Sequence, residues 1–268
     1  MEEKAGLHIS LASERLFELW GVPITNTLLA SWLVIVFLLV LGYFVGKNPK
    51  MIPGKLQNFF EMVLDFVLGF MEQTLGSRAL AIKYFPLVAT IFLFIATANV
   101  FDFFPFFGTF GLLRHGEIIP LFHAVNTDLN VTLALAIISV LSIEVAGIMT
   151  LGVWTYGSKF FNFTSVIGFV VGLIEFVSEM SRFVSFSFRL FGNIFAGQVL
   201  LGVIALFVPY ILPAPLMAFE LFVGVVQAAV FAMLTLFFIK MAITPPHDYS
   251  GKGKHLPAGR QVPAHTAH

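Results

Sequence analysis

Five long apolar runs constrain the fold of this chain more than any other feature. The first, at residues 28–45, has eighteen consecutive residues without a charged side chain. An α-helix of that length crosses most of the roughly 30 Å hydrocarbon core of a bilayer. We expect membrane-spanning helices at about residues 28–46, 84–104, 129–154, 160–208 and 215–243. The sequence therefore predicts an all-α polytopic membrane protein, with a single transmembrane domain over residues 28–243.

The composition excludes several classes of function. Hydrophobic residues make up 58% of the chain and charged residues 11%, against about 25% charged in a soluble domain, so an ordinary water-soluble enzyme is excluded. Fifteen basic and fifteen acidic residues leave no net charge to attract nucleic acid. Because the chain has no cysteine, it has no thiol nucleophile and no thiolate metal site. We identify no cofactor site and no metal site.

Three segments outside the apolar runs have distinct characters. Residues 1–27 are polar enough to form an exposed external arm. At about residues 55–76, polar side chains follow one helical stripe and phenylalanines the opposite one, which predicts an amphipathic helix lying in the membrane interface. Residues 244–268 are polar and rich in proline and glycine, so we expect a disordered cytoplasmic tail.

The fourth apolar run is too long for an ordinary span. It has 49 residues and no proline, and one helix of that length would extend about 73 Å. It either folds back as a hairpin or lies strongly tilted. We take it as one strongly tilted span, and we expect the last helix to be tilted as well. With five spans, ten basic residues lie on one side and three on the other, and the positive-inside rule then places the N-terminus outside and the C-terminus inside. The ten are Lys47, Lys50, Lys55, Arg78, Lys83, Lys159, Lys240, Lys252, Lys254 and Arg260, and the three are Lys4, Arg15 and Arg114.

The fourth run also carries a polar stripe. Helical spacing places one set of polar side chains on a single face, namely Glu175, Ser178, Arg182, Ser185, Arg189 and Asn193. For Arg182, Glu175 and Glu179, mutual pairing and function are both open. Arg189 is flanked by charge-free sequence. A guanidinium does not release its proton, so Arg189 can hold, attract or block charge but cannot relay protons.

Two further apolar runs also carry polar side chains. Glu220 and Gln227 share a face of the last run, and Asn99 and Asp102 lie near the outer end of the second. Either pair alone is compatible with a hydrogen bond between helices. Polar side chains from three helices together favour an aqueous path. Glu144 is compatible with an interfacial position or with function, and the role of Glu179 also stays open.

The segment Phe188–Gly197, F-R-L-F-G-N-I-F-A-G, resembles the signature of subunit a of the F-type rotary ATP synthases. Asn99–Pro105, Asp128–Leu133 and Gln227–Ala242 resemble further parts of that family, so the similarity covers about residues 28–242. The resemblance implies a proton-channel stator subunit that is not catalytic on its own. It implies as partners the c-ring, the peripheral-stalk b subunits and the rest of the complex in a bacterial plasma membrane.

The resemblance also implies roles for single residues. Arg189 would be the essential stator arginine, with Asn193 and Gln227 beside it. Glu175, Ser178 and Arg182 match an inner half-channel, and Asn99, Asp102 and Glu220 an outer one. The chain departs from a common pattern at Gln198, where many relatives have a carboxylate, and at Glu220, where some have histidine.

Three alternatives to a proton-conducting subunit make different demands on the sequence. A sodium-translocating version of the same subunit stays open. A secondary ion transporter is less favoured because no inverted repeat is visible. An intramembrane hydrolase is disfavoured because the sequence has neither H-E-x-x-H nor G-x-S-x-G.

Overall fold

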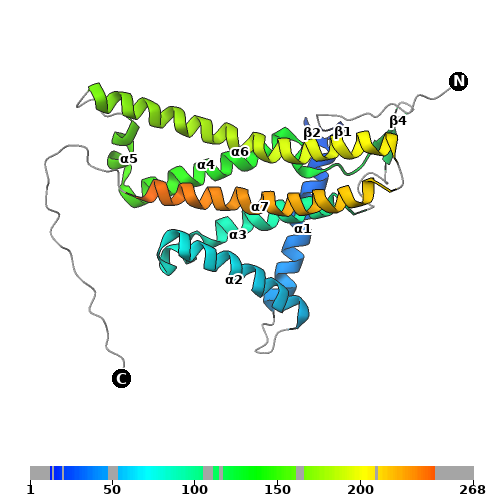
Figure 1. Cartoon of the computed structure of the whole chain (residues 1–268), viewed down its shortest axis with the longest axis horizontal. Helices are drawn as coiled ribbons and strands as arrows, with labels where there is room; N and C mark the ends of the chain where they lie inside the picture. Colours follow the sequence, from blue (N-terminus) through cyan, green and yellow to red (C-terminus); the bar gives the residue numbers. More distant parts are fainter. Residues whose placement is uncertain are drawn as a thin grey trace.

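The computed structural model describes residues 13, 15–19, 21–47, 54–104, 111–114, 117–160, 166–208 and 211–244. Most of these residues are helical (Figure 1). The helices are α1 (Asn26–Lys47), α2 (Lys55–Leu75), α3 (Arg78–Phe101), α4 (Leu129–Leu151), α5 (Val153–Phe160), α6 (Val166–Phe207) and α7 (Pro213–Ile243). A short 3-10 helix, η1, covers Val125–Thr127. The predicted tail from residue 245 onward lies outside the described residues.

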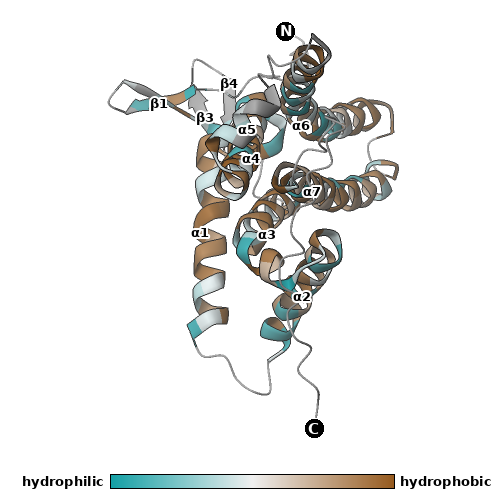
Figure 2. Cartoon of the chain, turned by 90° about the vertical axis from the view of Figure 1, so that its left-hand side faces the viewer, coloured by the Kyte–Doolittle hydropathy of each residue, from teal (hydrophilic) through white to brown (hydrophobic). Residues whose placement is uncertain are grey.

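Five of these helices are long and apolar enough to cross a membrane, namely α1, α3, α4, α6 and α7. The predicted all-α architecture with five spans is confirmed. The predicted amphipathic helix is also present as α2, which buries Met71 and Leu75 and leaves Glu61 and Asp65 outside the core. Figure 2 shows α2 as a mixture of polar and apolar residues, whereas α1 is largely apolar.

The fourth apolar run forms one continuous helix rather than a hairpin. Helix α6 has 42 residues, which corresponds to about 63 Å. Helices α3, α4, α6 and α7 lie side by side, and α1 runs across them (Figures 1 and 2). A helix as long as α6 stays within a bilayer only when it is strongly tilted.

The structure differs from the sequence prediction at the end of the third run. The predicted span continued to residue 154, but α4 ends at Leu151 because Gly152 has a φ of +82°. Side chains with a Cβ rarely adopt that conformation, so glycine ends the helix there. The chain resumes as α5, and α6 begins at Val166 rather than at residue 160. Hydropathy does not detect such a break, because the residues on both sides are apolar.

Two short hairpins were not predicted. Strands β1 (Arg15–Leu19) and β2 (Val22–Thr25) pair antiparallel, with Arg15 opposite Thr25 and Leu19 opposite Val22. Part of the expected N-terminal arm is therefore a β-hairpin. Strands β3 (Gly111–Arg114) and β4 (Glu117–Pro120) pair in the same way. None of the four strands alternates strictly between polar and apolar residues, so the period-2 pattern that predicts a strand is absent.

The main core lies between α2, α3, α4, α6 and α7. Its fully buried side chains come from α3, α4, α6 and α7, and they include Ile95, Ile143, Leu190, Phe231 and Leu236. A second small core holds the start of α1 against the segment before α4. There Thr27 donates a hydrogen bond of 2.8 Å to Asp128, whose side chain also caps α4 through the backbone N–H of Asn130. These contacts position η1 next to α3.

Candidate functional site

Helices α6 and α7 pack antiparallel in a defined register. Four contacts establish it, namely Gly197 with Glu220, Asn193 with Gln227, Phe186 with Phe231, and Arg182 with Phe238. This register places the polar residues predicted from the sequence into two groups. One group lies near the start of α6, and the other lies near the start of α7.

Arg189 lies on the exposed face of α6 between these two groups. Its Nη2 donates a hydrogen bond of 3.3 Å to Ser185 Oγ, one turn earlier on the same helix. Arg189 makes no ion pair with any residue that the structure describes. The guanidinium therefore presents a permanent positive charge at the surface of the helix pair, as its position in the predicted stripe implies.

Asn193 and Gln227 meet between α6 and α7. Asn193 Nδ2 donates a hydrogen bond of 3.3 Å to Gln227 Oε1. Gln227 is buried, and its own Nε2 has no partner in the described part of the chain. The pair lies one turn beyond Arg189, so it stabilises the helix contact next to the charge.

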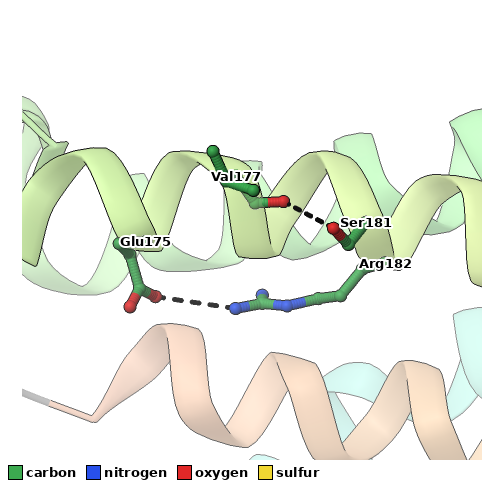
Figure 3. Close-up of polar contacts among 4 residues, drawn as sticks. All are labelled: Glu175, Val177, Ser181 and Arg182. Atoms are coloured by element: carbon green, nitrogen blue, oxygen red, sulfur yellow. Dashed lines mark hydrogen bonds and ion pairs between the residues drawn. The ribbon is translucent and has the colours of Figure 1, made fainter.

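Arg182 and Glu175 form an ion pair near the start of α6 (Figure 3), with 3.5 Å between Nη2 and Oε1. The Arg182 side chain is only 11% exposed, and its guanidinium stacks 4.6 Å from the ring centre of Phe238 on α7. A buried guanidinium of this kind needs a partner. The mutual pairing that the sequence left open is therefore present for Arg182 and Glu175, while Ser178 is exposed on the same helix.

A tyrosine that sequence analysis did not single out lies close to this group. Tyr156 of α5 is buried, and its ring packs directly on Gly147 of α4. Burial raises the pKa of the Tyr156 hydroxyl, and the nearby carboxylates of Glu144 and Glu179 raise it further. The hydroxyl therefore stays protonated. Tyr156 was missed because α5 was not predicted as a separate helix.

Asn99, Asp102 and Glu220 come together at the opposite end of the helix pair. Asn99 is buried and donates a hydrogen bond of 2.8 Å to the carbonyl of Gly224, one turn after Glu220. Asp102 follows the last residue of α3, accepts a hydrogen bond from the backbone N–H of Val125, and interacts electrostatically with Glu220. The structure therefore brings together the three side chains that the resemblance assigns to an outer half-channel.

Glu220 packs against α6 at a glycine. A Cβ added to Gly197 would lie 2.6 Å from Glu220 Oε1, so with a larger residue there the Glu220 side chain would have to shift. Gln198 is the next residue along α6 and is half-buried. Asn126 of η1 completes the group, since its Nδ2 donates a bond of 2.6 Å to Asn99 Oδ1. Asn126 was missed because it lies in an irregular segment that has no helical periodicity.

The arrangement is suited to moving ions rather than to bond chemistry. Acidic side chains lie on both sides of a fixed positive charge, and the charge sits on an exposed helix face. Among the described residues, no three His, Asp or Glu side chains group as a metal site would require.

Comparison with known proteins decides the family. Residues 28–240 match the family model for the ATP synthase A chain. The chain belongs to this family. It is 34% identical to the sodium-ion-specific ATP synthase subunit a of Propionigenium modestum, over 87% of this chain and 78% of that one. It is 31% identical to ATP synthase subunit a of Moorella thermoacetica over 84% and 93%, and 34% identical to that of Mycobacterium ulcerans over 84% and 89%.

The predicted family is thus confirmed, and two conclusions follow from membership. The chain is an integral membrane protein, because five described helices are long and apolar enough to span a bilayer. It is also a subunit of an ATP synthase complex. Membership in the ATP synthase A chain family supports an ion-conducting role in the stator.

Proposed function

We propose that this subunit conducts protons through two offset half-channels that Arg189 separates. Protons enter along Asn99, Asp102 and Glu220 and load a carboxylate on the c-ring. After rotation they leave along Glu175, Ser178 and Arg182. The observation that carries this proposal is the α6–α7 register, which has acidic groups on either side of an arginine without a counterion in the described chain.

Arg189 prevents direct leakage between the half-channels. A guanidinium favours the ionised form of a carboxylate that approaches it, so it promotes proton release as each rotor carboxylate passes. Its fixed charge also repels a proton that would cross without rotation. Each proton that crosses 100 mV releases about 2.3 kcal/mol, and rotation captures this energy only when leakage is slow. Asn193 and Gln227 hold the two helices in register beside the arginine.

The c-ring is the proposed partner of the exposed face of α6. Only 11% of the residues in the apolar stretch of α6 are buried, compared with 44% for α7. Helix α6 is therefore the more exposed of the two, although it carries the polar stripe. Near Arg189 the exposed residues of α6 include the small residues Ser185 and Ala196, and a guanidinium beside such residues fits a rotor helix that carries a carboxylate. The b subunits of the peripheral stalk complete the proposed assembly, in a bacterial plasma membrane.

We propose the topology that follows from the basic residues. The segment 1–27 is external, residues 28–243 form one transmembrane domain, and residues 244–268 are cytoplasmic. With an external N-terminus, the outer ends of α3 and α7 meet at Asn99 and Glu220. This places the proposed entry site on the outside, in agreement with the direction of proton flow during ATP synthesis.

A sodium-conducting version is the second candidate, because one relative is named as sodium ion specific. Both are tested by reconstituting the membrane sector into liposomes and imposing a potassium diffusion potential. Proton uptake in sodium-free buffer, followed with a pH-sensitive dye, supports the proton channel. Uptake of radioactive sodium without proton uptake contradicts the proton channel and supports the alternative.

A further inference from the structure

Asn126 joins three elements around the proposed entry site. It lies in η1 and is fully buried. Its Nδ2 donates a hydrogen bond of 2.6 Å to Asn99 Oδ1, and Asn99 Nδ2 donates one of 2.8 Å to the carbonyl of Gly224. The Asn99 side chain is also tightly held, since a Cβ added to Gly224 would lie 3.0 Å from Asn99 Cβ. The chain of bonds links η1 through α3 to α7.

These bonds determine which way the Asn126 amide points. A backbone carbonyl such as that of Gly224 can only accept, so Asn99 turns its Nδ2 toward α7 and its Oδ1 toward Asn126. Asn126 must donate a hydrogen bond to this oxygen from its own Nδ2. Its Oδ1 therefore points away from Asn99, and it has no hydrogen-bond partner among the described residues.

The Asn126 oxygen is one of three buried acceptors near this pair. Asp102 Oδ1 and Glu220 Oε2 are also buried without a partner in the part of the chain that the structure describes. Asp102 lies three residues after Asn99, and Glu220 lies four before Gly224. Buried acceptors that lack donors are costly. Three of them together suit a species that supplies only donors, such as a hydrated proton.

Asp128, His123 and Arg189 are further ionisable groups on the elements that pack against Asn126. On its own segment, Asp128 accepts bonds of 2.8 Å from Thr27 and 2.9 Å from the backbone of Asn130. Its two oxygens are therefore both engaged. His123 lies three residues before Asn126 on the same segment. On α6 the nearest charged group is Arg189, which hydrogen-bonds Ser185 instead.

We infer that Asn126 is a positioning residue for proton entry. It holds the Asn99 amide against α7, and it offers Oδ1 as an acceptor to the hydrated proton between Asp102 and Glu220. The proton arrives on water as hydronium, passes to the ionised Glu220 carboxylate and leaves a neutral water molecule. Asn126 itself neither gains nor loses a proton. This inference rests on the proposed role of this group as the outer half-channel.

The test compares Asn126→Leu with wild type in the assembled complex. Membrane vesicles freed of the soluble ATPase sector are given a potassium diffusion potential, and passive proton conduction is measured while the pH on one side is varied. We expect conduction about tenfold lower at alkaline outer pH, the rate equivalent of roughly one lost hydrogen bond. The difference should shrink as the outer pH falls, because entry then no longer limits the flux. The dependence on inner pH should stay unchanged.

The matched control is Asn130→Leu, which makes the same change at an exposed position four residues later and should conduct like wild type. A loss that is equal at every outer pH, or no loss, would overturn the inference. Immunoblotting of the purified complex normalises conduction to assembled subunit. If Asn126→Leu does not assemble, Asn126→Ser retains an acceptor and should show a smaller loss with the same outer-pH dependence, and a pH-independent loss overturns the inference there too. Absence of proton conduction in the wild type would instead contradict the proposed function.

Discussion

Two arginines on one face of α6 have different environments. Arg182 is nearly buried and its charge is balanced by Glu175 at 3.5 Å, with Phe238 stacked beneath it. Arg189 is exposed and hydrogen-bonds only to Ser185 within the described chain. The first arginine is therefore satisfied inside the subunit. The second presents its charge to whatever contacts α6.

Arg189→Lys should abolish ATP-driven proton pumping although the charge is retained. A compact ammonium lacks the planar five-donor fork of the guanidinium, so it cannot bond to Ser185 and a passing carboxylate with the same geometry. Fluorescence quenching of a pH-sensitive dye in inverted vesicles measures pumping. The matched control is Arg78→Lys in the exposed pair with Glu72 at 3.6 Å, which should pump normally because such surface pairs contribute little. Pumping near the wild-type rate in Arg189→Lys would contradict the proposal that Arg189 separates the two half-channels.

Glu220→Gln should slow proton uptake without disturbing assembly. The amide has nearly the same size, so it fits the space that Gly197 leaves, but it cannot exchange protons. Gln198 lies next to Gly197 on α6, so the double variant Glu220→Gln with Gln198→Glu should restore part of the flux. Passive conduction and ATP synthesis provide the measurement. If the single variant matches wild type in both, Glu220 only packs the helices, and the outer path depends on Asp102 or on water.

At the scale of elements, helical periodicity predicts faces that recur along a helix, but it does not predict a single break in a helix or a single contact between distant segments. The spacing of Arg182, Arg189 and Asn193 predicted one polar face, and α6 is a single helix with these residues along it. The break at Gly152 depends on one backbone angle, which hydropathy does not record. Asn126 joins the site through contacts between distant segments, and such contacts leave no pattern in the local sequence.

Gly147→Ala should destabilise the docking of α5 on α4. The added methyl group would overlap the ring of Tyr156, and overpacking of this kind typically costs about 1–3 kcal/mol. Thermal denaturation of the purified complex in detergent should show a lower transition temperature. Gly157→Ala on α5 is the matched control, since its Cβ would meet nothing within 4 Å. In a Tyr156→Ala background, Gly147→Ala should cost less stability than it does in the wild type, and an equal or larger cost there would contradict the steric explanation.

At the scale of the whole molecule, the site lies at contacts between helices that are far apart in sequence. Figure 1 shows α3, α4, α6 and α7 side by side. Asn99 and Gly224, which are joined by a hydrogen bond of 2.8 Å, are separated by 125 residues in the sequence. The family signature around Arg189 predicted the identity of the candidate residues, but their distances depend on how these helices pack. The side of the membrane on which each group opens then depends on the topology of the chain.

The topology makes a prediction about the two ends of the chain. Five spans are an odd number, so residues before α1 and after α7 should lie on opposite sides, and the ten-to-three basic split places the C-terminal side in the cytoplasm. Because the chain has no cysteine, Ser10→Cys and Ser250→Cys each introduce a unique thiol. A membrane-impermeant maleimide should label Ser10→Cys in intact cells and Ser250→Cys in inverted vesicles. Ser139→Cys, at a fully buried position of α4, should react in neither. Labelling of both terminal cysteines from the same side would require an even number of spans. It would also move the proposed entry group at Asn99 and Glu220 away from the side on which proton uptake must begin.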